Sequence, residues 1–489
     1  MSYLKTGNKR RIDRLLIVSN RLPIGLFKDE IGNWQVKAST GGLITALTPI
    51  LGNMDGLWIG WSGTLEKVDP NEVRTLGGKE TGLELKAINL TEDEITQYYY
   101  GFSNKIIWPL FHDLQTHCDF DPDYWHAYQT VNRKFAEVVA ENIRTNDYSW
   151  IHDYHLMLVA RELHALGIND KLGFFLHVPF PPLDIFLKLP WRIQILEALL
   201  HYDLLGFQTA RDRNNFIHCV EAFNIDLHHD ARRQVSTLTL PDRKIQAGIF
   251  PISIDFNDFA QQARSKEVNK EVQKIHKALP NRQIILGVDR LDYSKGLPQK
   301  MLAIKNLLDR FPDLRRKVTL IQVVVPSRED IPQYQQQKSE VEGLVSEING
   351  EFTRTGWIPV HYVFRSLTRT ELLAYYRAAD MSLVTSLKDG MNLVSKEYCA
   401  ARIDNTGVLI LSEFAGSASH LRRNALLINP YDMEGVANAI HQAYNMSKNE
   451  RQSRMRKLRE RIRTHDIFWW ADAFLSSATA DMTNESPMV

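Results

Sequence analysis

The sequence predicts an α/β protein with two doubly wound, Rossmann-like domains, and two observations carry that prediction. Short apolar runs recur along the chain, and each is followed by a longer segment of helical periodicity. Runs that are apolar on both faces suit parallel strands covered on both sides by helices. The chain also has 489 residues, which is too long for one ordinary core, so two domains are expected.

The predicted strands form two groups, one in each half of the chain. We expect them at 15–19, 149–153, 172–178 and 204–208, and then at 283–288, 318–325, 381–385 and 408–412. The pattern changes at 250–258, where a proline and two aspartates precede a highly charged segment. We therefore place one domain at 1–255 and the other at 256–465, facing each other across a cleft.

The segment 466–474 concentrates four aromatic residues in a helix-compatible stretch. So many large apolar groups must be buried against a surface. Two alternatives stay open for the C-terminal helix expected within 466–489: it packs on the second domain, or it returns to the first.

Composition limits the classes of partner. The formal net charge is +1, from 59 basic and 58 acidic residues. Such a balance provides no field that gathers nucleic acid or an anionic membrane, so neither is expected as a partner. An anionic ligand must be held by local cations.

Cysteine usage and the N-terminus indicate the compartment. The three cysteines are scattered without a C-x-x-C pair, which disfavours a disulfide framework and a cysteine zinc site. The first 14 residues are polar and basic and lack the features of a signal peptide. No run approaches the roughly 20 apolar residues of a membrane span. A cytoplasmic location is expected.

Two cations lie in the segment 287–296, directly after a predicted strand. Arg290 and Lys295 are five residues apart in the turn that leaves this strand, at the edge where open α/β sheets place their ligands. A guanidinium and an ammonium can take up the charge of a departing diphosphate. The alternative from spacing alone is a surface ion network of Arg290 with Asp289 or Asp292.

A second candidate segment begins at Asp389, after the predicted strand 381–385. Asp389 and the following glycine form a tight turn, so the amides of 391–394 would lie at a helix N-terminus, which binds phosphate. Glu397 lies about two turns into this helix and could accept hydrogen bonds from a ribose diol. The alternative is ordinary capping by Asp389, with Glu397 and Lys396 as a surface pair.

The first half offers further groups at predicted strand ends. Asp153 and His177 each follow an apolar run, and Asp153 is a plausible base or acceptor for sugar hydroxyls. Arg21 follows the first strand and, with Tyr99 and Trp108, could bind a sugar phosphate. Without context, the two aromatic residues equally fit a core position. The glycine pair that ends at Gly42 is weak by itself.

Taken together, these segments resemble the trehalose-6-phosphate synthases, a family of retaining glycosyltransferases with the two-domain GT-B fold. The resemblance covers about 15–470. The segments that carry it are Ser19-Asn-Arg-Leu-Pro23, Trp58-Ile-Gly-Trp-Ser-Gly63, Trp150-Ile-His-Asp-Tyr-His155, Gly173-Phe-Phe-Leu-His-Val-Pro-Phe-Pro181, Arg290-Leu-Asp-Tyr-Ser-Lys-Gly296 and Asp389-Gly-Met-Asn-Leu-Val394. Six segments in the right order are hard to obtain by chance.

The resemblance implies a role for each candidate residue. The catalytic set is Arg290 and Lys295 on the donor diphosphate, with His177 beside the transferring glucose. The donor-binding residues are Gly42, Asp389, Gly390, Met391, Asn392, Leu393, Val394 and Glu397. The acceptor-binding residues, for glucose-6-phosphate, are Arg21, Tyr99, Trp108, Asp153 and Arg328.

The implied reaction is transfer of glucose from a nucleotide-glucose, UDP-glucose first among the candidates, to glucose-6-phosphate with retention, the first step of trehalose biosynthesis. The family needs no carboxylate nucleophile, and we expect neither a cofactor nor a metal. The acidic stretch 119–123 resembles a metal motif of another fold but is interpreted as a turn.

Other functions and partners also follow from the resemblance. The alternatives are a transferase with another acceptor, such as a glucosylglycerol-phosphate synthase, a pseudo-glycosyltransferase, and a non-catalytic sugar-phosphate sensor. A homo-oligomer is expected. Because the resemblance ends near Trp470, dephosphorylation of the product is assigned to a separate trehalose-6-phosphate phosphatase.

Overall fold

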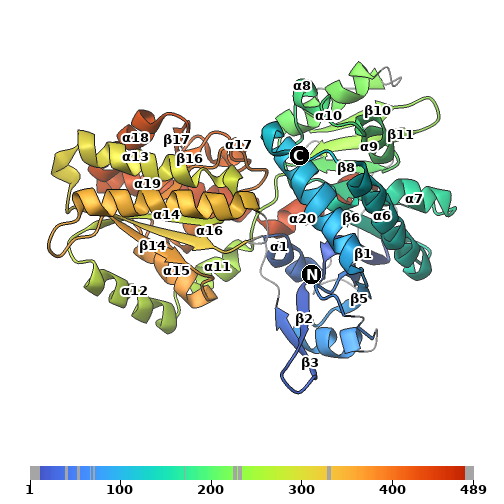
Figure 1. Ribbon diagram of the computed structural model, residues 1–489, viewed down its shortest axis with the longest axis horizontal. Coiled ribbons are helices and arrows are strands. Elements are labelled where there is room, and N and C mark those ends of the chain that lie inside the picture. The colour runs from blue at the N-terminus through green and yellow to red at the C-terminus, as the bar shows by residue number, and fades with distance from the viewer. Residues whose placement is uncertain are drawn as a thin grey trace. The chain divides into compact units, whose positions relative to one another are not determined.

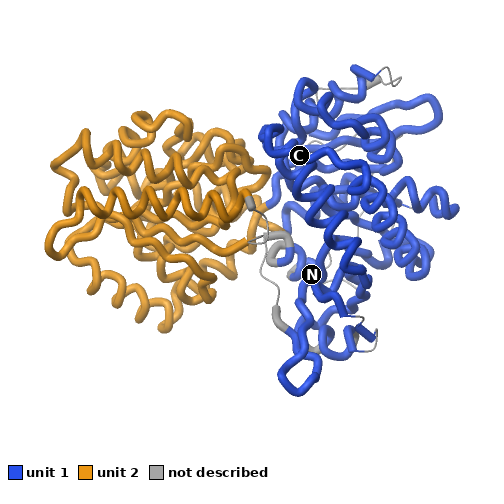
Figure 2. The backbone as a smooth tube through the Cα atoms, viewed as in Figure 1, with its two compact units in different colours: residues 1–252, 468–489 blue, residues 253–467 orange. Residues whose placement is uncertain are grey.

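The computed structural model describes residues 12–38, 42–51, 56–66, 68–69, 72–169, 171–223, 228–229, 234–327 and 332–479. The chain divides into two compact units (Figure 2). Unit 1 comprises residues 1–252 and 468–489, and unit 2 comprises 253–467. The division lies inside the segment 250–258, at which the sequence pattern changes. Both units are built of helices around a sheet that is mostly parallel in unit 1 and entirely parallel in unit 2, which confirms the predicted α/β class (Figure 1).

Unit 1 contains a nine-stranded sheet in the order β5-β4-β1-β6-β7-β8-β11-β10-β9. Its strands are β1 (Arg14–Arg21), β4 (Gly56–Trp61), β5 (Glu84–Ile88), β6 (Asp147–His152), β7 (Leu172–Phe175), β8 (Leu204–Phe207), β9 (His228–His229), β10 (Val235–Thr239) and β11 (Lys244–Ile249). The strands from β5 to β11 in this order are parallel, whereas β10 and β9 are antiparallel additions. A separate hairpin, β2 (Ile24–Lys28) and β3 (Trp34–Ala38), follows β1.

The helical segments of unit 1 are α1 (Gly42–Leu51), η1 (Val73–Gly77), α3 (Gly78–Thr81), α4 (Glu92–Glu94), η2 (Ile95–Ile107), α5 (Trp108–Phe111), η3 (Gln115–His117), α6 (Pro122–Asn142), η4 (Tyr154–Leu156), α7 (Val159–Ala165), α8 (Leu183–Phe186), α9 (Arg192–Leu199), α10 (Ala210–Ala222) and α20 (Ile467–Thr479). The acidic stretch 119–123 leads into α6, where the Asp121 side chain caps the helix by accepting from the amide of Asp123. The acidic stretch 119–123 therefore forms the start of a helix rather than an isolated turn.

Unit 2 contains a six-stranded sheet that is parallel throughout, in the order β14-β13-β12-β15-β16-β17. Its strands are β12 (Gln283–Arg290), β13 (Val318–Val325), β14 (Val360–Phe364), β15 (Met381–Val384), β16 (Val408–Ser412) and β17 (Leu426–Ile428). Its helical segments are α11 (Phe256–Gln262), α12 (Lys266–Ala278), η5 (Tyr293–Lys295), α13 (Leu297–Arg310), η6 (Pro312–Leu314), α14 (Pro332–Phe352), α15 (Arg369–Ala378), α16 (Leu393–Ala401), α17 (Ala418–Leu421), α18 (Met433–Asn445) and α19 (Lys448–Thr464).

The two sheets share one strand order. In chain order, the six strands from β5 to β8 in unit 1 and all six strands in unit 2 follow the pattern 3-2-1-4-5-6 of the Rossmann fold. The order reverses between β1 and β6 in unit 1 and between β12 and β15 in unit 2. Ligands of such sheets bind beyond the carboxyl ends of the strands at this reversal.

All eight predicted strands are present. These strands could be predicted from continuous apolar runs because their side chains are buried on both faces of the sheet. In β6 and β16 every residue is buried. The sequence did not indicate the other described strands, which are β2, β3, β4, β5, β9, β10, β11, β14 and β17, nor that η2 is a 13-residue π-helix. Short strands and a change of helical pitch leave no distinct periodic signal.

The C-terminal helix α20 packs on unit 1 from Phe468 onward. The indole of Trp470 stacks on Trp150 of β6 at 4.8 Å between ring centroids, and its Nε1 donates to the carbonyl of Phe250. Phe474 stacks on the same Trp150 ring at 4.4 Å. Trp470 and Phe474 therefore complete the core of unit 1, whereas Phe468 is exposed.

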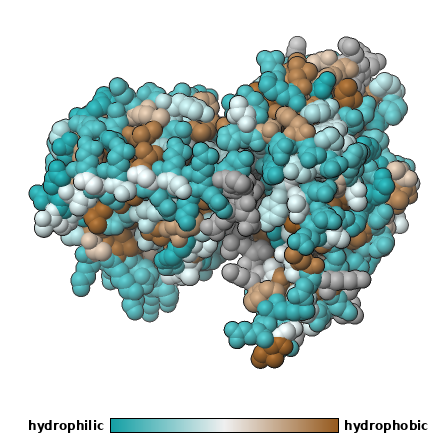
Figure 3. Space-filling view, in the orientation of Figure 1, coloured by the Kyte–Doolittle hydropathy of each residue, from teal (hydrophilic) through white to brown (hydrophobic). Residues whose placement is uncertain are grey.

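On the face shown in Figure 3, hydrophobic residues form small separate groups among hydrophilic ones. Among the helices of the described ranges, none has both the length and the apolar character required to cross a membrane.

Candidate active site

The end of β1 is built to hold Arg21. The hydroxyl of Ser19 donates to the carbonyl of Arg21 at 2.7 Å and accepts from Nε1 of Trp58 at 2.8 Å. The amide oxygen of Asn20 accepts from the Tyr98 hydroxyl at 2.9 Å. These buried bonds fix the backbone from which the Arg21 guanidinium projects.

The Arg21 guanidinium lies on the ring of Trp61, a residue to which the sequence analysis assigned no role, and near the predicted Tyr99. Its Cζ is 3.8 Å from the ring centroid of Trp61 and 5.6 Å from that of Tyr99. Gly63 has φ +90°, and a Cβ there would lie 2.3 Å from Arg21 Nη1. Stacking leaves the planar fork of an arginine able to bind a phosphate, so Trp61 and Gly63 are parts of this site.

Tyr99 and Trp108 belong to one aromatic cluster with Arg21. The ring of Tyr99, in η2, stacks on His155 with centroids 5.9 Å apart and meets Trp61 edge-on. Trp108 is only 6% exposed and packs against Tyr154. The ring centroids of Tyr154 and His155 are 3.9 Å apart. The cluster joins three of the predicted acceptor residues, although Trp108 is also a core residue.

Asp153 and His177 follow the neighbouring strands β6 and β7. Asp153 adopts φ +76°, its amide donates to the carbonyl of Phe175, and its Oδ1 accepts the amide of His177 at 3.1 Å. A non-glycine residue with positive φ is strained, and such strain concentrates at functional sites. The two predicted residues are therefore coupled at the carboxyl edge of the unit 1 sheet.

His177 contacts a second histidine that was not predicted to have a role. Its Nε2 lies 3.1 Å from Nδ1 of His152, the last residue of β6. Both side chains are buried. Burial lowers the pKa of His177 to about 3, and burial, together with the neighbouring His177, lowers the pKa of His152 well below its ordinary value. Both imidazoles are neutral near pH 7.

Two predicted residues lie at or beyond a boundary of the described ranges. Gly42 is the first residue of α1, after residues 39–41, which lie outside the described ranges. Arg328 also lies outside the described residues.

In unit 2, Lys295 and Asp389 come together directly. The Nζ of Lys295 lies 2.7 Å from Asp389 Oδ2, and both side chains are about nine-tenths buried. The same oxygen accepts from the Ser386 hydroxyl at 3.3 Å and from Nδ2 of Asn392 at 3.2 Å. A Cβ on Gly296, at φ +63°, would lie 2.2 Å from the carbonyl of Thr385, so the loops after β12 and β15 approach closely.

Arg290 lies at the end of β12, on the same connection as Lys295. Its Nη2 is 3.8 Å from Oδ2 of Asp292, and its side chain is about half exposed, whereas Asp292 is fully buried. Asp292 is itself held by the amide of Ser294. The ion pair considered from spacing is therefore present, but it is long and leaves the guanidinium accessible.

The amides near Asp389 divide into two groups. Those of Met391 and Asn392 donate to Asp389 Oδ1, each at 3.2 Å. Asn392, at φ +55°, caps α16, so Leu393 and Val394 are the first two residues of that helix. Their N–H groups have no acceptor within the helix and lie at its positive end. Of the predicted amides, those of Leu393 and Val394 are therefore the ones at the helix start that have no acceptor within the helix.

Glu397 is not the partner of Lys396. Its Oε2 accepts from the hydroxyl of Tyr376 at 2.7 Å, while Lys396 is only 1% exposed. Burial raises the pKa of Glu397, and the Tyr376 hydrogen bond opposes that shift. The carboxylate is oriented by a tyrosine that the sequence did not single out.

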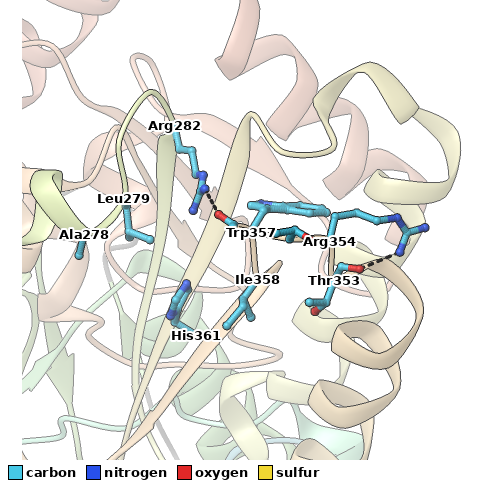
Figure 4. A pocket seen from close by; sticks show the side chains of 10 residues that line it. Ala278, Leu279, Arg282, Thr353, Arg354, Trp357, Ile358 and His361 are labelled. Atoms are coloured by element: carbon cyan, nitrogen blue, oxygen red, sulfur yellow. Dashed lines mark hydrogen bonds between the residues drawn. The ribbon is translucent and has the colours of Figure 1, made fainter.

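A surface pocket of about 460 Å³ lies at the opposite edge of the unit 2 sheet (Figure 4). It is lined by Arg282, just before β12, and by His361 on β14. None of the predicted site residues lines it. The carboxyl edge therefore remains the candidate active site.

Within unit 2, a cation pair and a helix N-terminus can neutralise a diphosphate, while Asp389 and Glu397 can accept from sugar hydroxyls. Within unit 1, Arg21 on its aromatic face can bind a phosphorylated sugar. The described residues contain no group of three or more potential metal ligands.

Comparison with known proteins identifies related chains. A trehalose-6-phosphate synthase of Mycolicibacterium smegmatis is 40% identical over 470 residues, which are 95% of this chain and 92% of the relative. An alpha,alpha-trehalose-phosphate synthase [UDP-forming] A of Dictyostelium discoideum is 38% identical over 97% of this chain. This chain spans 64% of the length of that relative.

A crystal structure of an alpha,alpha-trehalose-phosphate synthase (UDP-forming) from Burkholderia xenovorans, in complex with glucose-6-phosphate, superimposes with a TM-score of 0.85 at 35% identity. The match covers 96% of this chain and all of the other. The two Rossmann-like units give this chain the GT-B fold. A model of the family described as Glycosyltransferase family 20 matches residues 13–480. The chain belongs to glycosyltransferase family 20.

Proposed function

We propose that the protein is an α,α-trehalose-6-phosphate synthase, a retaining hexosyltransferase that moves glucose from UDP-glucose to glucose-6-phosphate. The observation that carries the proposal is the contact of Lys295 with Asp389, which joins the loops after β12 and β15, where the strand order of unit 2 reverses. Arg290, the last residue of β12, and the N-terminus of α16 lie at the same edge of the sheet. The family relatives named for this activity support the choice of substrates.

The donor is assigned to unit 2. Arg290 and Lys295 neutralise the diphosphate, and the amides at the start of α16 add partial positive charge without reorganising. Asp389 accepts from hydroxyls of the glucose, and Glu397 accepts from the ribose. From unit 1, Gly42 at the start of α1 and His177 after β7 are also assigned to the donor, His177 to its transferring glucose.

The acceptor is assigned chiefly to unit 1. Arg21, lying on Trp61, binds the phosphate of glucose-6-phosphate together with Arg328. Tyr99 and Trp108 offer flat faces to the pyranose, and Asp153 accepts from its hydroxyls.

In the reaction, the bond between glucose C1 and the donor phosphate oxygen breaks. A bond forms on the same face between C1 and the 1-hydroxyl oxygen of the acceptor, whose proton passes to an oxygen of the departing UDP. No carboxylate attacks C1, so catalysis depends on positioning and on neutralising the diphosphate. Fixed cations supply that charge, and we propose a reaction that needs no metal or cofactor.

A product assay tests this proposal. Purified protein in EDTA is offered UDP-, GDP- or ADP-glucose with glucose-6-phosphate or glycerol-3-phosphate, and products are identified by mass and by anomeric coupling. Trehalose-6-phosphate with retained configuration is expected. Turnover only with glycerol-3-phosphate would indicate another acceptor, a dependence on added metal would refute the metal-free mechanism, and no turnover with any pair would favour a sensor.

Three further expectations accompany the function. Cys118, Cys219 and Cys399 are free thiols, which supports a reducing cytoplasmic location. A homo-oligomer remains an expectation, which sedimentation would test. The phosphorylated product is expected to be dephosphorylated by a separate phosphatase.

A further inference from the structure

The contact between His152 and His177 joins two buried rings at the ends of adjacent strands. His152 is fully buried, and His177 is 2% exposed. The Nδ1 of His152 lies 3.1 Å from Nε2 of His177, and the ring centroids are 5.3 Å apart. A hydrogen bond at this distance requires one nitrogen to carry the proton and the other to accept it.

Two proton arrangements satisfy this hydrogen bond. In the first, His152 Nδ1–H donates to His177 Nε2, so that the remaining N–H of the pair is on Nδ1 of His177. In the second, His177 Nε2–H donates to His152 Nδ1, so that the remaining N–H is on Nε2 of His152. Which arrangement holds decides whether His177 donates or accepts.

The surroundings of His152 favour the first arrangement. Its ring lies among aromatic rings, with centroids at 4.7 Å from Trp150 and 6.5 Å from both Phe175 and Trp470. Its Nε2 has no hydrogen-bond partner within the described chain. Each arrangement leaves one buried N–H without an acceptor in the described chain, on His177 Nδ1 in the first and on His152 Nε2 in the second. Because aromatic rings surround His152, its N–H would be left without an acceptor in the bound state as well, and such an orphaned donor is costly, so the second arrangement is disfavoured.

The first arrangement leaves its free N–H where a ligand can use it. The Nδ1 of His177 also has no partner among the described residues. His177 is the residue assigned to the transferring glucose. Its N–H would then find an acceptor in a sugar oxygen when substrate binds.

We propose that His152 is a positioning residue that fixes His177 as its Nδ1–H tautomer, making His177 a hydrogen-bond donor to an oxygen of the transferred sugar. The inference rests on the proposed function. His152 does not touch the substrate in this arrangement and acts through one hydrogen bond. The packed rings of Trp150 and Trp470 keep its imidazole from turning away.

Three substitutions of His152 separate the role of its N–H from that of its volume. Asparagine places an amide N–H near the position of Nδ1, glutamine places it near Nε2, and phenylalanine has no donor. We expect His152→Asn to keep kcat within about threefold of wild type, and His152→Gln and His152→Phe to lose about a hundredfold with little change in either KM. Thermal unfolding of each variant separates this loss from a loss of the fold.

A spectroscopic measurement reads the tautomer directly. Long-range proton–nitrogen correlation spectra of the full chain labelled with ¹⁵N-histidine report which ring nitrogen carries hydrogen, and the His177 signals are identified by their absence in His177→Asn. We expect Nδ1–H in wild type and in His152→Asn, and a loss of that preference in His152→Phe. If His152 only supported the fold, its substitution would not change which ring nitrogen of His177 carries the hydrogen.

A second histidine pair provides the matched control. The Nδ1 atoms of His164 and His201 are 2.7 Å apart, and both residues precede strands, β7 and β8, at the opposite edge of the same sheet. His201→Phe should leave kcat and the His177 tautomer unchanged.

Wild-type His177 protonated on Nε2 would overturn the inference, as would equal loss of kcat in the asparagine and phenylalanine variants. An unchanged tautomer and kcat in His152→Phe would also overturn it. Absence of transfer from UDP-glucose to glucose-6-phosphate by wild type would instead refute the proposed function, while the wild-type tautomer would still test the proton assignment.

Discussion

The ammonium of Lys295 lies 2.7 Å from Oδ2 of Asp389, so a mostly buried ion pair joins the loops that follow β12 and β15. A diphosphate that reached Lys295 would compete with Asp389 for it. The pair thus holds the cation in place before the donor arrives and leaves Asp389 supported by Ser386 and Asn392 when the cation shifts.

Replacing Lys295 by methionine removes this cation while keeping much of its volume. We expect kcat/KM for UDP-glucose to fall about a hundredfold or more, because the diphosphate loses a buried positive charge. Unit 2 should also lose about 3 kcal/mol of unfolding free energy, because a buried carboxylate loses its charged partner. Steady-state kinetics and urea unfolding measure the two effects. Lys305→Met, at an exposed ion pair with Glu347, should change neither appreciably.

Arg290→Ala should affect activity far more than stability. The guanidinium is about half exposed and lies 3.8 Å from the buried Asp292, so this long and partly screened pair should contribute less to folding than the pair of Lys295 and Asp389. Loss of diphosphate stabilisation should lower kcat about a hundredfold or more. Arg310→Ala, on the exposed end of α13, is the matched control. An active Arg290→Ala enzyme would remove this residue from the catalytic set.

Gly63→Ala should weaken acceptor binding. Its Cβ would lie 2.3 Å from Arg21 Nη1, which must move from the Trp61 face, and we expect KM for glucose-6-phosphate to rise about tenfold. Gly32 has nearly the same backbone angle, φ +89°, but open space around it. Gly32→Ala should therefore cost about 1–2 kcal/mol of stability and leave KM unchanged. Equal KM values for glucose-6-phosphate in both variants would show that acceptor binding by Arg21 does not depend on its packing against Gly63.

The buried histidines should make unit 1 less stable in acid. The pKa of His177 is about 3 in the folded protein, below its ordinary value of 6.5. Below pH 6.5 the unfolded chain binds a proton that the folded one refuses, so stability falls as pH decreases. At pH 5 this one group costs about 2 kcal/mol relative to pH 7.

Urea unfolding followed by tryptophan fluorescence at pH 7 and pH 5 checks this. His177→Asn should show a smaller decrease between the two values. A decrease identical to that of wild type would mean that His177 does not contribute. His177 should also remain neutral throughout the activity range, so an acidic limb in the rate profile near pH 6 would have to belong to another group.

Much of the fold could be predicted because buried parallel strands carry continuous apolar runs, as β1 does. The neighbouring strand β4 was missed because glycine is unfavourable in strands and its two tryptophans fit many environments. The structure explains the glycine: a Cβ on Gly60 would lie 2.8 Å from the carbonyl carbon of Arg21. Gly60 therefore weakens the sequence pattern of β4, yet the close approach of β1 requires a glycine at this position.

The candidate site was predicted in part for the same reason. Strand ends could be located, so Arg290, Asp153 and their neighbours could be placed on the correct edges. The hydrogen-bond partner of each side chain could not be predicted from neighbouring residues, since the carboxylate that contacts Lys295 is 94 residues away in the sequence. Tyr99 stacks on the ring of His155, and the periodicity of the local sequence carries no information on such stacking.

The packing of α20 on unit 1 has a consequence for synthesis. Trp470 and Phe474 cover Trp150, yet the ribosome makes them only after the whole of residues 253–467. Domains generally fold as units while the chain emerges. Unit 2 can therefore fold first, whereas the sheet of unit 1, although synthesised earlier, keeps the ring of Trp150 uncovered until α20 has been made.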